Sequence, residues 1–136
     1  MIDVPAPVRR SQQERRASTR RRLLEACEAC LVEHGHAGTT TTEVVARAGL
    51  SQGALFRHFP TKASLLAATA EKLFEGLVSS YREDLQAVVL RSEAPGERVM
   101  AAFDLLWEIF EGSRLVAAFE LYMGARTDPE LSASLT

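Results

Sequence analysis

Gln52 and Arg57 carry the side chains with the most specific chemistry in this sequence. A glutamine amide can hydrogen-bond to adenine or to a phosphate, and an arginine guanidinium can reach guanine or a phosphate. If the residues around them form a helix, Leu55 and Phe59 lie on its buried face. Its outer face then carries Gln52, Ala54, Arg57 and His58. The short side chains near the start of this helix would let it enter the major groove of a DNA duplex closely.

Signals on both sides confine this helix to about 52–58. Ser51 is a good N-cap, because its hydroxyl can accept a hydrogen bond from an amide of the first turn. Pro60 biases Phe59 away from helical dihedral angles, so the helix ends at that residue or just before it. The result is a short helix with one apolar and one polar side.

A second short helix, about Thr41–Ala48, is expected just before it. Thr40 and Glu43 form a T-x-x-E capping box, in which hydroxyl and carboxylate satisfy backbone amides reciprocally. Gly49 permits a sharp turn, and Leu50 is expected to anchor that turn as a buried side chain. Two short helices joined in this way match a helix-turn-helix. The alternative is a pair of ordinary short helices in a bundle.

Helical periodicity covers most of the remaining chain and no β-alternation appears, so the expected fold class is all-α. A first helix is expected from about Ala17 to Gly35, where a left-handed cap is suitable; Ser18 or Ser11 could cap its start, and its apolar stripe includes Leu24, Cys27 and Leu31. Thr61 is expected to cap a long helix that runs to about Leu90. The other expected helices are about Glu97–Glu111, about Arg114–Ala125, and one that starts at Asp128-Pro129-Glu130.

The residues from Thr40 to Lys62 resemble the DNA-binding signature of the TetR (tetracycline-repressor-like) transcriptional regulators. The resemblance is strong over about residues 17–66 and weaker to the end, where Ala125–Leu131 resembles a common helix junction of that family. It implies a three-helix, homeodomain-like helix-turn-helix domain followed by a helical-bundle domain for effector binding and dimerisation. Because the family's final helices are missing from this sequence, we expect that bundle to be incomplete.

The resemblance also implies which residues touch DNA. Family members place their third helix in the major groove, whereas the start of the second helix and a lysine at the start of the fourth, here Lys62, hold phosphate or an adjacent base. The implied contact residues are Thr40, Thr41, Thr42, Ser51, Gln52, Gly53, Ala54, Phe56, Arg57, His58 and Lys62. Four positions depart from the family: Ala54 and Phe56 replace common hydroxyl residues that can bond DNA, Thr41 replaces an apolar residue, and His36 replaces an aromatic one.

Charge divides the chain in the same place. Residues 1–62 carry ten Lys/Arg and six Asp/Glu and residues 63–136 carry six and twelve, so net charges of +4 and −6 underlie the total of −2. A basic front half fits polyanion binding. We therefore expect a flexible basic leader (1–14), a helix-turn-helix domain (15–62) and a truncated ligand-binding and dimerisation domain (63–136). The alternative for the arginines at 9–22 is a solvated, disordered leader.

Cys27, Cys30 and His34 share one helical face and invite a zinc interpretation, because Zn²⁺ accepts thiolate and imidazole ligands. Free cysteine also behaves as a small hydrophobic residue, and ligands drawn from one helix fit a tetrahedron poorly. The packing interpretation is therefore favoured, and we expect neither a metal nor another cofactor.

An aromatic stripe in the acidic half either fills the core or lines an effector pocket. The residues expected to face such a pocket are Phe103, Trp107 and Tyr122. Its ligand would be a small molecule of unknown identity that releases the protein from DNA, as the family resemblance implies.

Other function classes have little support in the sequence. It contains no nucleophile elbow, no phosphate-cradling glycine loop, no transmembrane span and no secretory signal, so we expect a cytoplasmic regulator rather than an enzyme or a membrane protein. The expected partners are a palindromic DNA operator and a second copy of the chain, with repression as the expected outcome. Two alternatives remain: an interaction module that pairs with a full-length partner without binding DNA, and a purely structural helical domain. If the bundle is incomplete, its last three helices should expose an apolar face.

Overall fold

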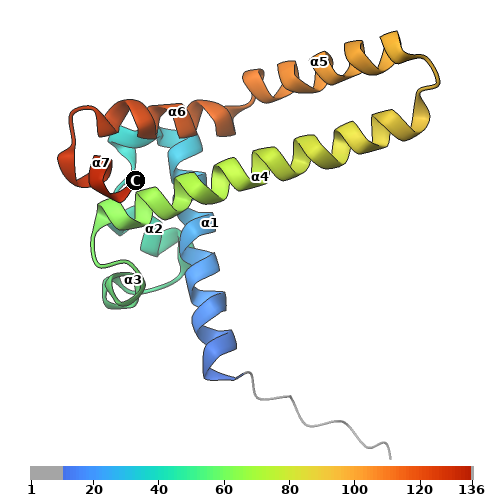
Figure 1. The fold of residues 1–136 in the computed structure, drawn as a ribbon. Coiled ribbons are helices and arrows are strands. Elements are labelled where there is room, and N and C mark those ends of the chain that lie inside the picture. The colour runs from blue at the N-terminus through green and yellow to red at the C-terminus, as the bar shows by residue number, and fades with distance from the viewer. Residues whose placement is uncertain (1–10, 136) are drawn as a thin grey trace, which may run out of the picture.

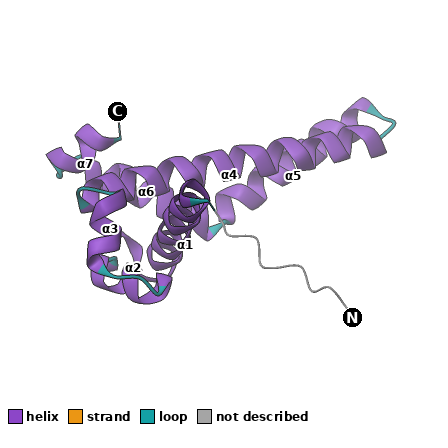
Figure 2. Cartoon of the chain, turned by 90° about the horizontal axis from the view of Figure 1, so that it is seen from below, coloured by secondary structure: helices purple, strands orange, loops and turns teal. Residues whose placement is uncertain are grey.

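The computed structural model describes residues 11–135, and this part of the chain contains helices and no strand. The expected all-α class is thereby confirmed. The helices are α1 (Gln12–Gly38), α2 (Thr41–Ala48), α3 (Gln52–His58), α4 (Lys62–Arg91), α5 (Pro95–Glu111), α6 (Ser113–Ala125) and α7 (Pro129–Ser134). In Figure 1, α2 and α3 lie beside α1, whereas α4 and α5 run side by side away from them. Figure 2 shows the same pairing of α4 and α5 from below.

Helix α1 begins at Gln12, well before the expected Ala17. A capping box closes its first turn: the Ser11 hydroxyl accepts from the Glu14 amide at 3.1 Å, and the Glu14 carboxylate accepts from the Ser11 amide at 2.7 Å. Residues 12–14 are thus helical, which shortens the expected flexible leader, and its residues 1–10 lie outside the described residues. At the other end, Gly35 has φ 70° and ψ 179°, so the regular helix is interrupted there.

Helices α1, α2 and α3 share one core in which Leu23, Val44 and Leu55 are fully buried. Cys27 and Cys30 lie in the same core, which confirms the packing interpretation of the two thiols. Burial raises the pKa of Cys27 to about 11, so this thiol is protonated at neutral pH. Across residues 11–135, no group of three His, Cys, Asp or Glu side chains is arranged to hold a metal ion.

Helix α6 folds back onto α1 and α4, and α7 packs on α4 and α6. Ala118, Leu121 and Leu131 are fully buried there. Gly124 allows α6 to approach the end of α1, because a Cβ atom at this position would lie 2.8 Å from the His36 ring. The Glu120 carboxylate accepts a hydrogen bond from the His36 backbone amide at 2.8 Å. The basic half and the acidic half of the chain therefore pack directly on each other.

Helix α5, in contrast, has no buried residue. Large apolar side chains are exposed along α5 and α6, which confirms the expected apolar surface on these two helices; the expectation was wrong for α7, because Leu131 is fully buried. We call this surface the apolar face. It consists of Val99, Met100, Phe103, Leu106, Trp107, Phe110, Val116, Phe119, Tyr122 and Met123.

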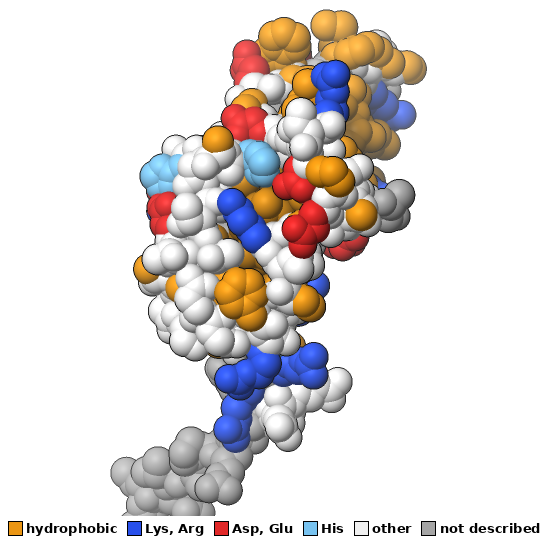
Figure 3. All heavy atoms as spheres, turned by 90° about the vertical axis from the view of Figure 1, so that its left-hand side faces the viewer, with side chains coloured by type: hydrophobic (Ala, Val, Ile, Leu, Met, Phe, Trp, Pro, Cys, Tyr) orange, Lys and Arg blue, Asp and Glu red, His pale blue; other side chains and the backbone are white. Residues whose placement is uncertain are grey.

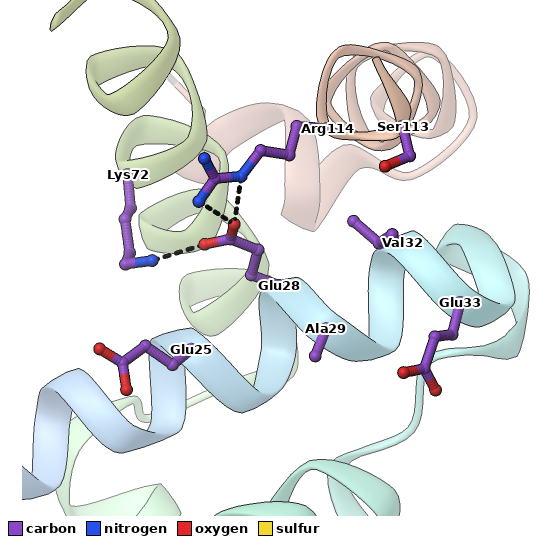
Figure 4. Close-up of a pocket in the computed structure, with 8 residues that line it drawn as sticks. All are labelled: Glu25, Glu28, Ala29, Val32, Glu33, Lys72, Ser113 and Arg114. Atoms are coloured by element: carbon purple, nitrogen blue, oxygen red, sulfur yellow. Dashed lines mark hydrogen bonds and ion pairs between the residues drawn. The ribbon is translucent and has the colours of Figure 1, made fainter. Parts of the chain in front are cut away.

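The carboxylate of Glu28 links α1 to α4 and to α6. Glu28 of α1 is buried and accepts from Lys72 Nζ of α4 at 2.5 Å and from Arg114 Nε of α6 at 2.7 Å. Figure 4 shows these two cations converging on Glu28 at the edge of a hollow that Val32 and Ser113 also line. Burial alone would raise the pKa of Glu28, but the hydrogen bonds and charges of Lys72 and Arg114 hold it below its ordinary value.

Candidate nucleic-acid interface

The turn between α2 and α3 has the geometry that its sequence predicted. Gly49 is left-handed, with φ 64° and ψ 41°, and the Leu50 amide donates to the Val45 carbonyl at 2.9 Å. Arg22 of α1 donates to the carbonyls of Ala48 at 2.6 Å and Gly49 at 3.4 Å. The expected anchor Leu50 is half-buried and packs against the core without being enclosed by it. An arginine from outside the motif therefore holds the turn in place.

Helix α3 is fastened by its apolar side and presents its polar side. Ser51 caps it by accepting from the Ala54 amide at 3.1 Å, as expected. Leu55 is fully buried and Phe59 is nearly so, which leaves the opposite face open. Of the expected contact residues on and before this helix, Ser51, Gly53, Phe56 and Arg57 are exposed, whereas Ala54 and His58 are half-buried. Phe56, with 45% exposure, is an apolar group on this polar surface.

Gln52 is placed differently from the free outer-face residue that its spacing suggested. Its amide nitrogen donates to the hydroxyls of Thr42 at 3.2 Å and Thr41 at 3.4 Å, both at the start of α2. Its Oε1 atom is buried without a hydrogen-bond partner. The structure thus brings three of the expected contact residues together into one cluster across the two helices.

The start of α2 differs from the expected capping box. Thr40 accepts from the Glu43 amide at 3.2 Å, but the Glu43 carboxylate does not return to the Thr40 amide. It lies 2.7 Å from Nε2 of His34 on α1 instead. The reciprocal half of the box was therefore a wrong prediction, because a histidine from another helix competes for the carboxylate. Thr40 and Thr42 are exposed and Thr41 is half-buried.

Lys62 is exposed at the first position of α4. Thr61 caps that helix, as expected, and accepts from the Ser64 amide at 3.1 Å. The free amides of a helix N-terminus and an adjacent lysine favour a phosphate. The three edges of the candidate surface are therefore the starts of α2, α3 and α4.

The structure adds arginines of α1 to this surface. Figure 3 views the side that carries α3: Lys and Arg side chains gather where α1 begins, and the visible Asp and Glu side chains lie farther up. Arg20 stacks over the Phe59 ring, with 5.1 Å from its guanidinium carbon to the ring centroid. Burial lowers the pKa of His58, and the positive charges of Arg16, Arg20 and Arg57 lower it further. The sequence placed Arg20 in a helix from about Ala17 and left Arg16 just before it, and the cap at Ser11 extends that helix over both residues.

The expected effector-pocket residues lie far from this surface and are open to solvent. Phe103 and Trp107 are 63% and 65% exposed on α5, and Tyr122 is 46% exposed on α6. Tyr122 makes an edge contact with Phe74 of α4, with ring centroids 5.4 Å apart. Trp107 Nε1 donates to the Glu111 carboxylate at 2.7 Å. The structure does not gather the three residues around one cavity.

In the part of the chain that the structure describes, no helix is both long enough and apolar enough to cross a membrane.

Comparison with known proteins finds a family match for one segment, relatives of similar sequence, and a solved structure of similar fold. Residues 23–69 match the family described as bacterial regulatory proteins, tetR family. An uncharacterised HTH-type transcriptional regulator of Mycobacterium tuberculosis is 36% identical over 128 residues, which cover 93% of this chain and 63% of that protein. The HTH-type transcriptional regulator CymR of Pseudomonas putida is 33% identical over 126 residues, with 93% and 60% coverage.

The solved structure of a TetR family transcription regulator from Marinobacter aquaeolei has a similar fold, with a TM-score of 0.63, 19% identity, and coverage of 91% of this chain and 68% of that one. The chain spans less than two thirds of the length of the curated relatives named above. Its matched residues, 23–69, contain the turn, α3 and the start of α4 that form the candidate surface. By this segment, residues 23–69, the chain matches the tetR family of bacterial regulatory proteins, and the relatives named above are HTH-type transcriptional regulators.

Proposed function

We propose that this protein regulates transcription by binding operator DNA through residues 15–62. The observation that carries the proposal is the open face of α3, held in place by the buried Leu55 and Phe59. In this arrangement Gly53 and Arg57 face the major groove, and Lys62 binds a backbone phosphate. Between Thr39 and Lys62 the only acidic residue is Glu43, and its carboxylate lies beside His34. The surface therefore attracts a polyanion without local repulsion.

Gln52 has a defined part in this proposal. Because its amide nitrogen already bonds two threonine hydroxyls, it enters the groove as a fixed group and not as a freely rotating one. The buried Oε1 atom lacks a hydrogen-bond partner, and the amino group of an adenine in the major groove is a donor that can supply one. DNA binding would thereby relieve an unsatisfied polar atom.

We also propose that a second copy of the chain supplies the second half-site, and that a small molecule bound by residues 63–136 changes the separation of the two recognition helices. Two-fold symmetry predicts a palindromic operator. An effector lowers operator affinity only by its preference for the conformation with the wrong separation. Repression is the favoured outcome, because helices seated in the groove exclude other proteins from that DNA. Phe103, Trp107 and Tyr122 remain the proposed effector contacts, enclosed only when another surface covers them.

Selection of bound fragments from random duplex DNA tests the proposal. We expect enrichment of a palindromic sequence, and we expect the Arg57→Ala variant to lose the preference at one position of each half-site. A reporter gene placed behind the selected sequence then separates repression from activation. The proposal fails if the purified protein retains no duplex even at low salt, where phosphate contacts are strongest.

A second candidate is an interaction module that pairs with a full-length partner and does not bind DNA. The apolar face favours it, because monomeric soluble proteins rarely expose so many large apolar side chains on two neighbouring helices. Gel filtration of the chain alone and with a full-length relative tests this candidate. A mixed complex without DNA retention supports it, and DNA retention by the isolated chain contradicts it.

A further inference from the structure

A cleft separates the first turns of α1 from α3. Its volume is about 410 Å³, and its lining includes Arg15, Arg16 and Thr19 of α1 and Arg57 and His58 of α3. The cleft exists because the capping box at Ser11 extends α1 past α3. The recognition helix and the basic helix therefore form two walls of one hollow, next to the surface proposed to face DNA.

The charge in this cleft is of one sign. No Asp or Glu is among the described residues that line it. Arg20 lies just beyond, over the Phe59 ring, and its charge also reaches His58. Arg21 and Arg22 on the same helix do not line the cleft: Arg21 faces Glu25 at 3.9 Å, and Arg22 donates to the carbonyl of Ala48 in the turn. An anion in the cleft would meet arginine side chains from two helices at once.

Among the described residues that line the cleft, His58 is the only one with a side chain of a type that titrates near neutral pH. The charged groups that face it are Arg16 and Arg20 from α1 and its neighbour Arg57 from α3. Without an anion, this surrounding keeps the imidazole neutral at pH 7, because burial and three positive charges oppose protonation. A phosphate seated between the same arginines reverses the local field and favours the imidazolium.

We propose that the cleft between α1 and α3 holds a DNA backbone phosphate, and that His58 takes up a proton when this phosphate enters. This inference depends on the proposed function, and it adds a backbone contact shared by α1 and α3 and a dependence of DNA binding on pH. The sign follows from linkage: affinity rises as pH falls from above the pKa of His58 in the complex to below its value in the free protein.

The pH dependence is tested by fluorescence anisotropy with a labelled duplex at constant ionic strength. We expect wild-type affinity to increase from about pH 8 to about pH 6, by at most roughly tenfold per pH unit for one linked proton. His58→Gln should flatten this profile. His36→Gln is the matched control, because His36 lies at the opposite end of α1, against Gly124, and this variant should keep the wild-type profile.

The position of the phosphate is tested by the salt dependence of the same binding. Arg16→Gln should lower the slope of log affinity against log salt by about 0.9, the value for one lost phosphate contact. Arg21→Gln changes the same residue type on the same helix outside the cleft, and should leave the slope unchanged. Circular dichroism of each variant establishes that it is folded.

The outcomes separate this inference from the proposed function. If wild-type protein binds no duplex, the proposed function fails. If it binds but His58→Gln and wild type share one pH profile, or Arg16→Gln and Arg21→Gln share one salt slope, only the cleft proposal is overturned. NMR titration of His58 in the free protein, with inorganic phosphate and with duplex identifies the source of the anion. An equal rise of the His58 pKa with inorganic phosphate alone would contradict a DNA-specific site.

Discussion

At the scale of single residues, the candidate surface divides into side chains that hold the backbone and side chains that distinguish bases. Lys62 stands at a helix N-terminus, where a phosphate is favoured whatever the DNA sequence. Arg57 stands on the exposed face of α3, where a guanidinium can meet the edge of a guanine. Truncation of Lys62 should therefore lower the affinity for DNA in general, whereas truncation of Arg57 should lower sequence discrimination.

Lys62→Ala is expected to weaken binding to all duplexes by a similar factor. Because one phosphate contact is lost, the salt slope should fall by about 0.9. Titration of one selected and one scrambled duplex at several salt concentrations measures both effects. A loss confined to the selected duplex would show that Lys62 reads sequence instead.

Arg57→Ala is expected to reduce discrimination between a matched and a mismatched site, by about 1–3 kcal/mol at one base pair. Competition between the two duplexes measures this difference directly. If the variant binds both more weakly by the same factor, Arg57 is a phosphate contact and its assignment to base recognition is wrong.

At the scale of helices, two charged side chains of α1 hold the recognition unit together and join it to the rest of the molecule. Arg22 bonds the turn between α2 and α3, and Glu28 bonds α4 and α6 through Lys72 and Arg114. Each side chain makes hydrogen bonds that an apolar residue at the same position could not make. Each can be tested by one substitution with a neighbour on the same helix as its control.

Arg22→Ala should lower the free energy of unfolding by about 1 kcal/mol, since a charged donor to exposed turn carbonyls is lost. Arg21→Ala, which removes only an exposed pair with Glu25, should change stability by less than about 0.5 kcal/mol. Urea denaturation followed by circular dichroism measures both. Equal effects would mean that the turn does not depend on Arg22.

Glu28→Gln should cost about 2 kcal/mol, because two cations lose a buried carboxylate and both keep partial access to water. The sign of the pH effect follows from the lowered pKa of Glu28. Its contribution is present above the ordinary value of 4.5 and disappears as pH falls through the lower value of the folded state. Wild-type stability should therefore fall in acid more steeply than that of Glu28→Gln. Glu25→Gln, exposed on the same helix, should follow the wild-type curve.

At the scale of the whole molecule, the chain has a packed end and an open end. The core of α1, α2, α3 and the first part of α4 is closed by α6 and α7, whereas α5 lies only against α4 and α6 (Figure 1). The apolar face on α5 and α6 is consequently left uncovered in the part of the chain that the structure describes. A surface of this kind favours association, because covering it removes apolar area from water.

Trp107 reports on that association because it is the only tryptophan in the chain and is exposed on the apolar face. We expect its emission to shift to shorter wavelength as protein concentration rises, in parallel with a larger mass by gel filtration. Phe103→Glu, one helical turn away on α5, should prevent both changes by placing a charge in the contact. A monomeric mass and constant emission at all concentrations would contradict this prediction.

Local sequence patterns were enough to predict most of the helices and the shape of the turn between α2 and α3. The αL glycine at Gly49 and the caps at Ser51 and Thr61 depend on bonds between residues at most a few positions apart, so local spacing is enough to predict them. The burial of Leu55 and Phe59 was predicted from the helical period in the same way. The family signature between Thr40 and Lys62 is also a local pattern, and it identified the type of domain.

The partners of the polar groups, in contrast, follow from how the helices pack on each other. Glu28 meets Arg114 at a separation of 86 residues and Arg22 meets Ala48 at a separation of 26, and no local pattern encodes such pairs. Because these pairs are also distant in sequence, local patterns did not predict that Gln52 donates to the threonines of α2 or that the Glu43 carboxylate lies beside His34. They also did not predict that arginines of α1 lie near His58. Whether Trp107 is core or surface also depended on packing, because helical period identifies an apolar side but not what covers it.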